Sequence, residues 1–138
     1  MLLHGIEVPV QIRHDNTLNK QLSSWDDDEQ VNVIITNPPF GGTEEDGIET
    51  NFTSELRTRE TADLFLQLII EVLKTKGRAA VVLPDGTLFG EGVKTKIKKL
   101  FFISFPTTTY EFRPPPNPPI FQSNTHLPLI IEANVWSI

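Results

Sequence analysis

The sequence contains no cysteine, only one methionine and one tyrosine, and no long apolar run. Without cysteine, neither a disulfide framework nor a zinc site with cysteine ligands can form. No apolar stretch approaches the roughly 20 residues that a helix needs to span a bilayer. The first residues also lack the basic and apolar regions of a signal peptide. We therefore expect a cytoplasmic protein without a membrane partner.

Basic residues are also few. The chain has 12 Lys and Arg and 18 Asp and Glu, which gives a formal net charge of −6. DNA binding rests largely on neutralising phosphates with basic side chains. The acidic balance thus argues against this chain gripping DNA alone. The acidic run at 26–29 is interpreted as a solvated turn, with magnesium binding as the alternative. His4, His14 and His126 show no ligand spacing, so we expect no metal site.

The most informative segment is residues 31–40. The β-branched run Val31–Thr36 predicts a short buried strand, because Val and Ile suit a sheet covered on both faces. Pro38 and Pro39 then end the strand, since neither has a backbone N–H to continue the ladder. Asn37-Pro38-Pro39-Phe40 should therefore form a stiff loop at the strand's carboxyl end, the edge where ligands bind in open α/β sheets.

The chemistry of this loop suits a flat base that carries an amino group. The Asn37 amide oxygen and the Pro38 carbonyl can accept hydrogen bonds from the two N–H groups of an exocyclic amine. The ring of Phe40 can stack on the base. Enzymes that modify a base in duplex DNA flip it into a pocket and recognise it in these two ways. The alternative is a chance junction between a strand and a turn.

Further elements follow from periodicity. Apolar residues at helical spacing predict a helix over 61–76 with Gly77 as its C-cap, followed by a buried strand over 78–83. With the strand over 31–36, these elements form a βαβ unit, which makes the two strands parallel. A helix over 92–100 carries lysines, interpreted as a solvated basic face, with phosphate contact as the alternative. The polar loop 41–60 either closes over a flipped base or is a disordered insertion.

Asn37 to Phe40 match the [DNS]-P-P-[YFW] signature of amino-methyltransferases that use S-adenosylmethionine. With the segments that follow, the chain resembles the M (modification) subunit of type I restriction–modification systems, an N6-adenine DNA methyltransferase. The stretches that carry this resemblance are Thr36–Gly42, Arg57–Phe65 and Gly77–Gly90, and it extends through Leu2–Ile6 and Ile12–Leu18 upstream and to about Lys99 downstream.

The resemblance implies DNA as the substrate and the specificity and restriction subunits of a type I system as partners. It implies that the Asn37 side chain and the Pro38 carbonyl hold the target amine, while Phe40 stacks on the base and Pro39 stiffens the loop. Two alternatives stay open. One is an Asn-Pro-Pro enzyme that modifies a protein glutamine, although such enzymes usually carry Tyr at the fourth position. The other is a remnant without activity.

S-adenosylmethionine is the implied cofactor, yet two elements that usually bind it are missing. The sequence has no G-x-G before residue 31 and too few residues there for two βα units. The family's Asp-Thr-Leu segment has a counterpart in Asp15-Asn16-Thr17-Leu18. Alignment on Thr-Leu places Asn16 at the position that contacts the cofactor's adenine, with Asp15 beside it. An Asx-turn at either residue is the alternative.

Two regions are predicted. Residues 1–100 should form part of a methylase catalytic domain, the second half of a Rossmann-like class I methyltransferase sheet, so that the chain is a fragment. Residues 101–138 hold seven of the 11 prolines and should form an irregular tail, because proline is unsuited to a buried strand pair. A frameshifted reading of the gene, disorder, or a polyproline II ligand for a partner would each explain this tail.

Overall fold

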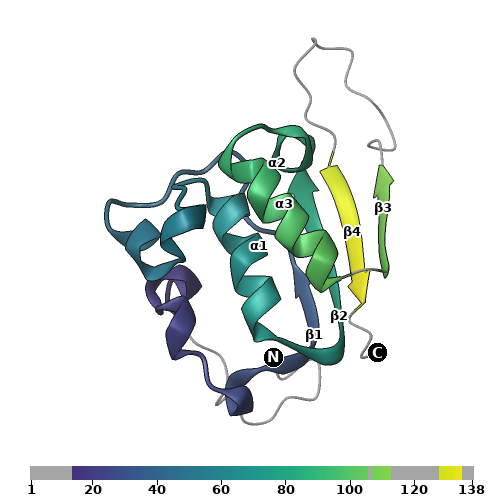
Figure 1. Ribbon diagram of the computed structural model, residues 1–138, viewed down its shortest axis with the longest axis horizontal. Coiled ribbons are helices and arrows are strands. Elements are labelled where there is room, and N and C mark those ends of the chain that lie inside the picture. Colours follow the sequence, from purple (N-terminus) through teal and green to yellow (C-terminus); the bar gives the residue numbers. More distant parts are fainter. Residues whose placement is uncertain (1–13, 106, 113–127, 135–138) are drawn as a thin grey trace.

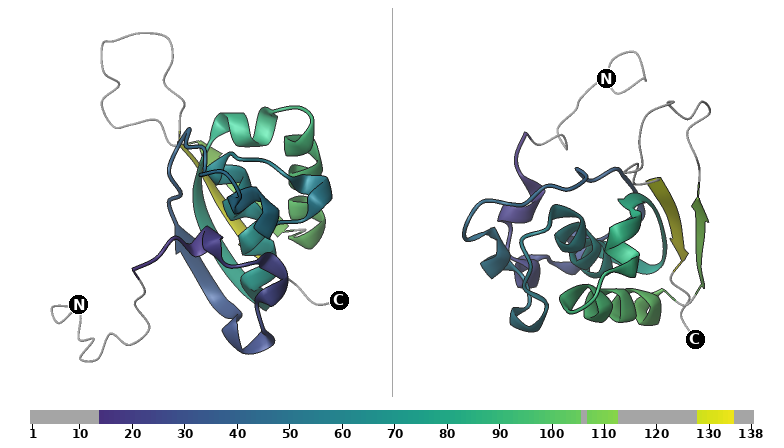
Figure 2. Two further views of the ribbon diagram at one scale, coloured as in Figure 1. Left: turned by 90° about the vertical axis from the view of Figure 1, so that its left-hand side faces the viewer. Right: turned by 90° about the horizontal axis from the view of Figure 1, so that it is seen from above.

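The computed structural model of the protein describes residues 14–105, 107–112 and 128–134. They form a four-stranded sheet with three helices against one of its faces (Figures 1 and 2). The strands are β1 (Val31–Thr36), β2 (Leu73–Pro84), β3 (Thr107–Phe112) and β4 (Pro128–Asn134), and the helices are α1 (Thr61–Val72), α2 (Asp85–Phe89) and α3 (Val93–Ser104).

The predicted βαβ unit is confirmed. β1 and β2 are neighbours in the sheet and run parallel, with Ile34 opposite Ala79 and Thr36 opposite Val81. The helix α1 connects them and lies across the sheet (Figure 1). The full strand order is β1-β2-β4-β3, and β4 runs antiparallel to both of its neighbours. The fold is therefore α/β with a mixed sheet.

Helix α1 ends at Val72, four residues before the predicted boundary. Leu73 is already extended and pairs with Val31 in the sheet, so pairing with β1 overrides the helical pattern. Gly77 is not the C-cap. Lys76 instead adopts the left-handed conformation, at φ 67°. Gly77 is buried, and a Cβ there would lie 2.7 Å from the Lys74 carbonyl oxygen, so a close backbone approach explains this glycine.

Two apolar clusters hold the helices in place. The first lies between the sheet and helices α1 and α3, and Phe101 and Phe105 meet edge to face in it, with ring centroids 4.6 Å apart. The second joins the other flank of α1 to the segments that hold Leu18 and Phe52. Packing on both flanks explains why the apolar surface of α1 is wider than a single stripe.

The prediction that β1 is buried on both faces is wrong for the part of the chain that the structure describes. Ile34 packs into both apolar clusters, but Val33 is 52% exposed and Ile35 is 83% exposed. β1 is an edge strand, and the described helices cover only one face of the sheet (Figure 2). Its β-branched run therefore has one packed side and one open side.

The prediction of an irregular tail is wrong for two stretches of 101–138. Strand β3 contains no proline, and β4 has only Pro128, at its first position, where the missing N–H is tolerated. Helix α3 also continues to Ser104, past the predicted boundary at 100. The prolines at 114–119, and with them the predictions of disorder, frameshift or a polyproline II ligand, lie outside the described residues.

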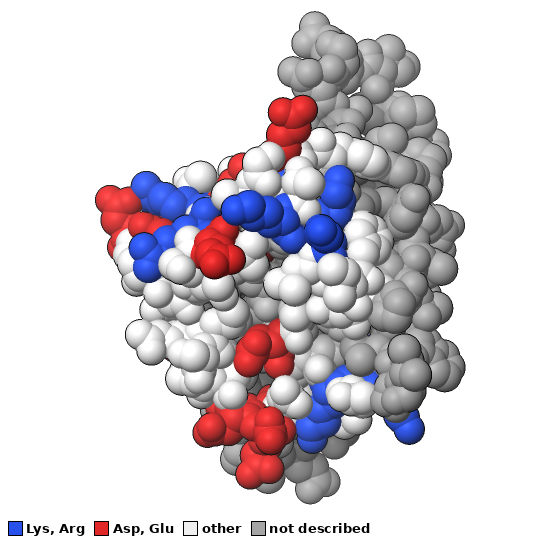
Figure 3. Space-filling view, in the orientation of Figure 1, with Lys and Arg blue, Asp and Glu red and all other residues white. Residues whose placement is uncertain are grey.

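None of the helices within the described ranges has the length and apolar character needed to cross a membrane. On the face shown in Figure 3, Lys and Arg side chains lie among Asp and Glu side chains over the helices. On α3, Lys96 and Lys99 are exposed, as expected for a solvated basic face, whereas Lys94 is half-buried and paired with acids. Lys94 therefore has a different role from the other lysines of this helix.

Candidate active site

The Asn37-Pro38-Pro39-Phe40 segment leaves the carboxyl end of β1, as predicted. Pro38 is buried, whereas Asn37, Pro39 and Phe40 are exposed. Gly41 follows at φ +65°, a left-handed conformation that favours glycine and turns the chain toward α1. The stiff dipeptide and this turn together keep the Phe40 ring at the sheet edge where both parallel strands end.

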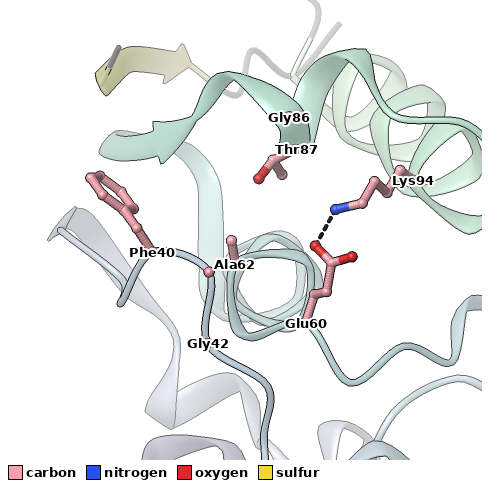
Figure 4. Close-up of a pocket in the computed structure, with 8 residues that line it drawn as sticks. Phe40, Gly42, Glu60, Ala62, Gly86, Thr87 and Lys94 are labelled. Carbon is pink, nitrogen blue, oxygen red and sulfur yellow. Dashed lines mark hydrogen bonds and ion pairs between the residues drawn. The ribbon is translucent and has the colours of Figure 1, made fainter. Parts of the chain in front are cut away.

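Phe40 lies beside a cavity of about 390 Å³, hereafter the Phe40 cavity (Figure 4). This volume lies within the range of about 300–1,000 Å³ that is usual for small-molecule sites. The lining residues come from the loop after β1 and from the first turns of all three helices: Phe40, Gly41, Gly42, Glu60, Ala62, Gly86, Thr87 and Lys94. Asn37, Pro38 and Pro39 are adjacent in sequence but are not among them.

The start of α1 is fixed against the loop after β1. The Thr61 backbone N–H donates to the Gly42 carbonyl at 3.0 Å. A Cβ on Gly42 would lie 2.9 Å from the Thr61 hydroxyl oxygen, so this close approach requires glycine. The loop that carries Phe40 is thus tied to the helix that supplies the opposite wall of the Phe40 cavity.

Lys94 forms a charged cluster at the far side of the Phe40 cavity (Figure 4). Its ammonium group pairs with Glu60 and lies 3.2 Å from Oδ2 of Asp63. Burial raises the pKa of the Asp63 carboxyl, and the charge of Lys94 and its hydrogen bond only partly oppose this. Burial also acts to lower the pKa of Lys94, but the hydrogen bond to Glu60 and the charge of Asp63 outweigh it and raise that pKa.

The loop 41–60 is ordered, contrary to the alternative of a disordered insertion. It contains 3₁₀ turns at Ile48–Asn51 and Ser54–Leu56, and Phe52 is buried in the second apolar cluster. The Asn51 side chain donates to the carbonyl oxygens of Leu18 and Asn19, at 3.1 Å each. The loop is therefore anchored to the segment before β1, and its action as a lid stays a prediction.

Glu44 in this loop connects two predicted parts of the site. One carboxylate oxygen accepts a hydrogen bond from the Thr61 hydroxyl at 2.7 Å, and the other accepts from the Asn16 amide at 3.0 Å. Glu44 was not predicted as part of the site, and neither were Glu60, Thr87 and Lys94. No local pattern distinguishes these residues, because their partners are distant in the sequence.

Asp15 and Asn16, the predicted contacts of the cofactor's adenine, lie away from the Phe40 cavity. With Thr17, Lys20 and Trp25 they line a smaller cavity of about 100 Å³, hereafter the Asn16 pocket. The Asn16 amide oxygen accepts from the Leu18 N–H at 3.0 Å, so the Asx-turn that was the alternative to a cofactor contact is present. One amide N–H and one lone pair remain after this bond and the bond to Glu44. One donor and one acceptor on the same amide can match the edge of an adenine. The Asx-turn is therefore compatible with a contact between Asn16 and the cofactor's adenine.

Within residues 14–105, 107–112 and 128–134, no group of three His, Asp or Glu side chains is arranged to hold a metal ion. The acidic run forms the solvated turn that was predicted. Residues Asp27–Glu29 make a 3₁₀ turn capped by Asp26, and Glu29 pairs with Lys20. His14 is exposed, and the other two histidines lie outside the described residues.

The family model described as N-6 DNA Methylase matches residues 1–104. The chain is 88% identical over 100 residues to the type I restriction enzyme EcoEI methylase subunit of Escherichia coli, covering 72% of this chain and 20% of that protein. It is 37% identical over 102 residues to the EcoKI methylase subunit of E. coli K12, covering 71% and 18%. The chain thus spans about a fifth of the length of these relatives.

Solved structures agree over a longer part of the chain. A structure that addresses assembly and conformational transition of the type I R-M system matches with a TM-score of 0.79 and 34% identity, covering 97% of this chain and 27% of that chain. The EcoKI M protein matches with a TM-score of 0.71 and 28% identity, covering 99% and 28%. The chain therefore belongs to the N-6 DNA methylase family and is similar to the modification subunits of type I restriction enzymes.

Proposed function

We propose that this chain supplies the target-base part of a site that transfers a methyl group from S-adenosylmethionine to N6 of an adenine in DNA. The observation that carries the proposal is the position of Asn37 to Phe40 at the carboxyl end of β1, with Phe40 beside a cavity of suitable size. The matched families support the reaction class, since the EcoKI M protein carries the classification of a methylase.

Asn37 and Pro38 would activate the target amine. The amine is a weak nucleophile because its lone pair is delocalised into the purine ring. Hydrogen bonds from its N–H groups to the Asn37 amide oxygen and the Pro38 carbonyl would localise that lone pair on nitrogen. Asn37 is exposed at the end of β1 and can reach a base, whereas buried Pro38 gives its carbonyl a fixed position. This is catalysis by positioning and electrostatics.

Phe40 would hold the base by stacking, and Pro39 would keep the loop stiff. Phe40 is 47% exposed and lines the cavity, so its side chain remains accessible to a ligand. When bound, S-adenosylmethionine supplies the electrophilic methyl group, and Asn16, with Asp15 beside it, would contact its adenine. Both Asn16 and the start of α1 hydrogen-bond to Glu44, which would fix the distance between cofactor and base.

The fold supports a place for the chain within a larger sheet. The order β1-β2-β4-β3 with an antiparallel β4 suits the second half of a Rossmann-like class I methyltransferase sheet. The exposed edge and open side of β1 would then be covered by the first half, which would carry the Gly-rich loop and the ribose-binding acid. The partners would be the specificity and restriction subunits, in the cytoplasm. The specificity subunit would supply most of the sequence-specific contact with the DNA, which makes the acidic charge of this chain tolerable.

Exchange into a relative tests this function. At 88% identity over 100 residues, transfer of this stretch into the EcoEI methylase subunit changes about 12 positions. In the exchanged methylase with its specificity partner, Asn37→Ala should lower the methylation rate by about a hundredfold or more. Its affinity for S-adenosylmethionine should stay unchanged, because Asn37 acts on the target amine. Asn32→Ala, on the same strand, is the matched control. Methylation by Asn37→Ala at the unmodified rate would refute the assigned role.

A further inference from the structure

Thr87 lines the Phe40 cavity, and the fold provides no hydrogen-bond partner for its buried hydroxyl. It lies in α2 and is 3% exposed, and its hydroxyl oxygen is buried with no hydrogen-bond partner. The hydroxyl points into the cavity, toward the space beside Phe40 (Figure 4). A buried hydroxyl without a partner is unfavourable, because it has lost water and gained nothing in return. A ligand that supplies a partner would remove this cost.

The remaining walls indicate which ligand fits. Phe40 offers an aromatic face, and Gly42 and Ala62 offer apolar surface. The ammonium group of Lys94 is surrounded by the carboxyl groups of Glu60 and Asp63, so the cluster carries no free positive charge for a phosphate. The occupant should therefore be neutral and flat, with a hydrogen-bonding edge. A heteroaromatic base meets these requirements.

We propose that Thr87 is a specificity-determining residue, whose hydroxyl donates a hydrogen bond to a ring nitrogen of the base that stacks on Phe40. This inference rests on the proposed function, since it assumes that the target base enters the Phe40 cavity. It adds a second recognition element on a separate wall. Phe40 follows β1, whereas Thr87 follows β2, so the base would be held between the ends of two adjacent parallel strands.

The test uses the full chain and 2′-deoxyadenosine as the probe. Saturable shifts of the Phe40 ring and Thr87 methyl NMR signals would report binding in the cavity. Thr87→Val keeps the shape and removes the hydroxyl, so it should weaken the Kd about fivefold, the value of one neutral hydrogen bond. Thr87→Ser should bind within about twofold of the unmodified chain. Thr95→Val is the matched control, because the Thr95 hydroxyl is exposed and donates to the Gly90 carbonyl.

Deaza analogues identify the nitrogen. We expect the penalty of Thr87→Val to disappear for one of the 1-, 3- and 7-deaza forms of the nucleoside, because that form lacks the acceptor. This is a double-mutant cycle between protein and ligand. An equal penalty for all three analogues, equal affinity of Thr87→Val and the unmodified chain, or no saturable binding of 2′-deoxyadenosine would each overturn the inference.

Failure of the proposed function and failure of the role of Thr87 give different results. If Phe40→Ala weakens binding of 2′-deoxyadenosine and Thr87→Val does not, the base enters the cavity and only the role of Thr87 is wrong. If Thr87→Val behaves as expected while Asn37→Ala methylates DNA normally in the exchanged methylase, the cavity binds a base but the catalytic role of the loop is wrong. Thermal unfolding of each variant shows that it is folded.

Discussion

The Phe40 cavity and the Asn16 pocket differ in how they are built. The Phe40 cavity takes its walls from the loop after β1 and from three helices. A hydrogen bond joins that loop to the start of α1, and an ion pair joins the start of α1 to α3. The Asn16 pocket takes its described walls from one segment, residues 15–25, and Asn16 itself is exposed. The walls of the Phe40 cavity are thus spread over residues 40–94, whereas those of the Asn16 pocket come from one short segment.

Under the proposed function, this difference would place the two parts of methyl transfer in different parts of the chain. The walls proposed for a target base lie near the carboxyl ends of β1 and β2. The proposed cofactor contacts, Asp15 and Asn16, belong instead to the segment that precedes β1. Glu44 joins the two parts, since it bonds both Asn16 and Thr61.

The largest effect is expected from Lys94→Met, which tests whether the Phe40 cavity depends on its ion cluster. Removing the cation leaves the buried Asp63 carboxylate without its partner, and the free energy of unfolding should fall by about 3 kcal/mol at pH 7. Urea unfolding measures it. Lys96→Met, on the exposed side of the same helix, should change little.

The pH dependence of this loss has a definite sign. The pKa of Asp63 is raised in the folded state, so its stabilising contribution is present below its ordinary pKa of 3.8 and is lost as pH rises through the folded value. Without Lys94 that pKa should rise further. The difference between Lys94→Met and the unmodified chain should therefore shrink in acid. A loss that is equal at pH 4 and pH 7 would show that Asp63 is not its cause.

The second-largest effect is expected from substitution of Phe40, which tests the proposed contact with the base. In the exchanged methylase, Phe40→Ala should lower kcat/KM for DNA about tenfold to a hundredfold, because stacking on a base is worth about 1–3 kcal/mol. Phe40→Tyr and Phe40→Trp should retain much of the activity, since stacking needs a ring. An alanine variant as active as the tyrosine variant would contradict the stacking role.

The smallest effect is expected from substitution of Asn16, and it should change the affinity for the cofactor. Asn16→Ala in the exchanged methylase should weaken the Kd for S-adenosylmethionine about fivefold, because about one hydrogen bond is lost. Binding of 2′-deoxyadenosine by the Phe40 cavity should not change. Ser23→Ala, in the next 3₁₀ turn and outside the pocket lining, is the control. Equal cofactor affinity for both variants would leave Asn16 as a turn residue only.

The sequence predicted the elements that local patterns determine. The β-branched run before Pro38 identified β1 and its loop, and helical spacing identified α1. It did not predict the end of α1 at Val72 or the open side of β1, because both depend on which strands lie beside β1. Strands β3 and β4 were missed because the prolines around them dominate the composition.

The residues of the candidate site also fall into those that a local pattern predicts and those that only the fold brings together. Asn37 to Phe40 were found because four consecutive residues carry the chemistry. Lys94 and its partners Glu60 and Asp63 are about 30 residues apart, and each looks like an ordinary surface charge in the sequence. Thr87 follows Asp85-Gly86 and is marked by no pattern. Only the fold brings these residues to one cavity.

The most direct test of the division between the two parts is isothermal titration of S-adenosylmethionine into this chain. We expect no saturable heat up to millimolar ligand, because the sequence has no Gly-rich loop before β1 and the Asn16 pocket offers few contacts. Under the same conditions 2′-deoxyadenosine should still shift the Phe40 signals. Saturable binding of S-adenosylmethionine at a stoichiometry near one would contradict the account, since the cofactor site would then be complete within these residues.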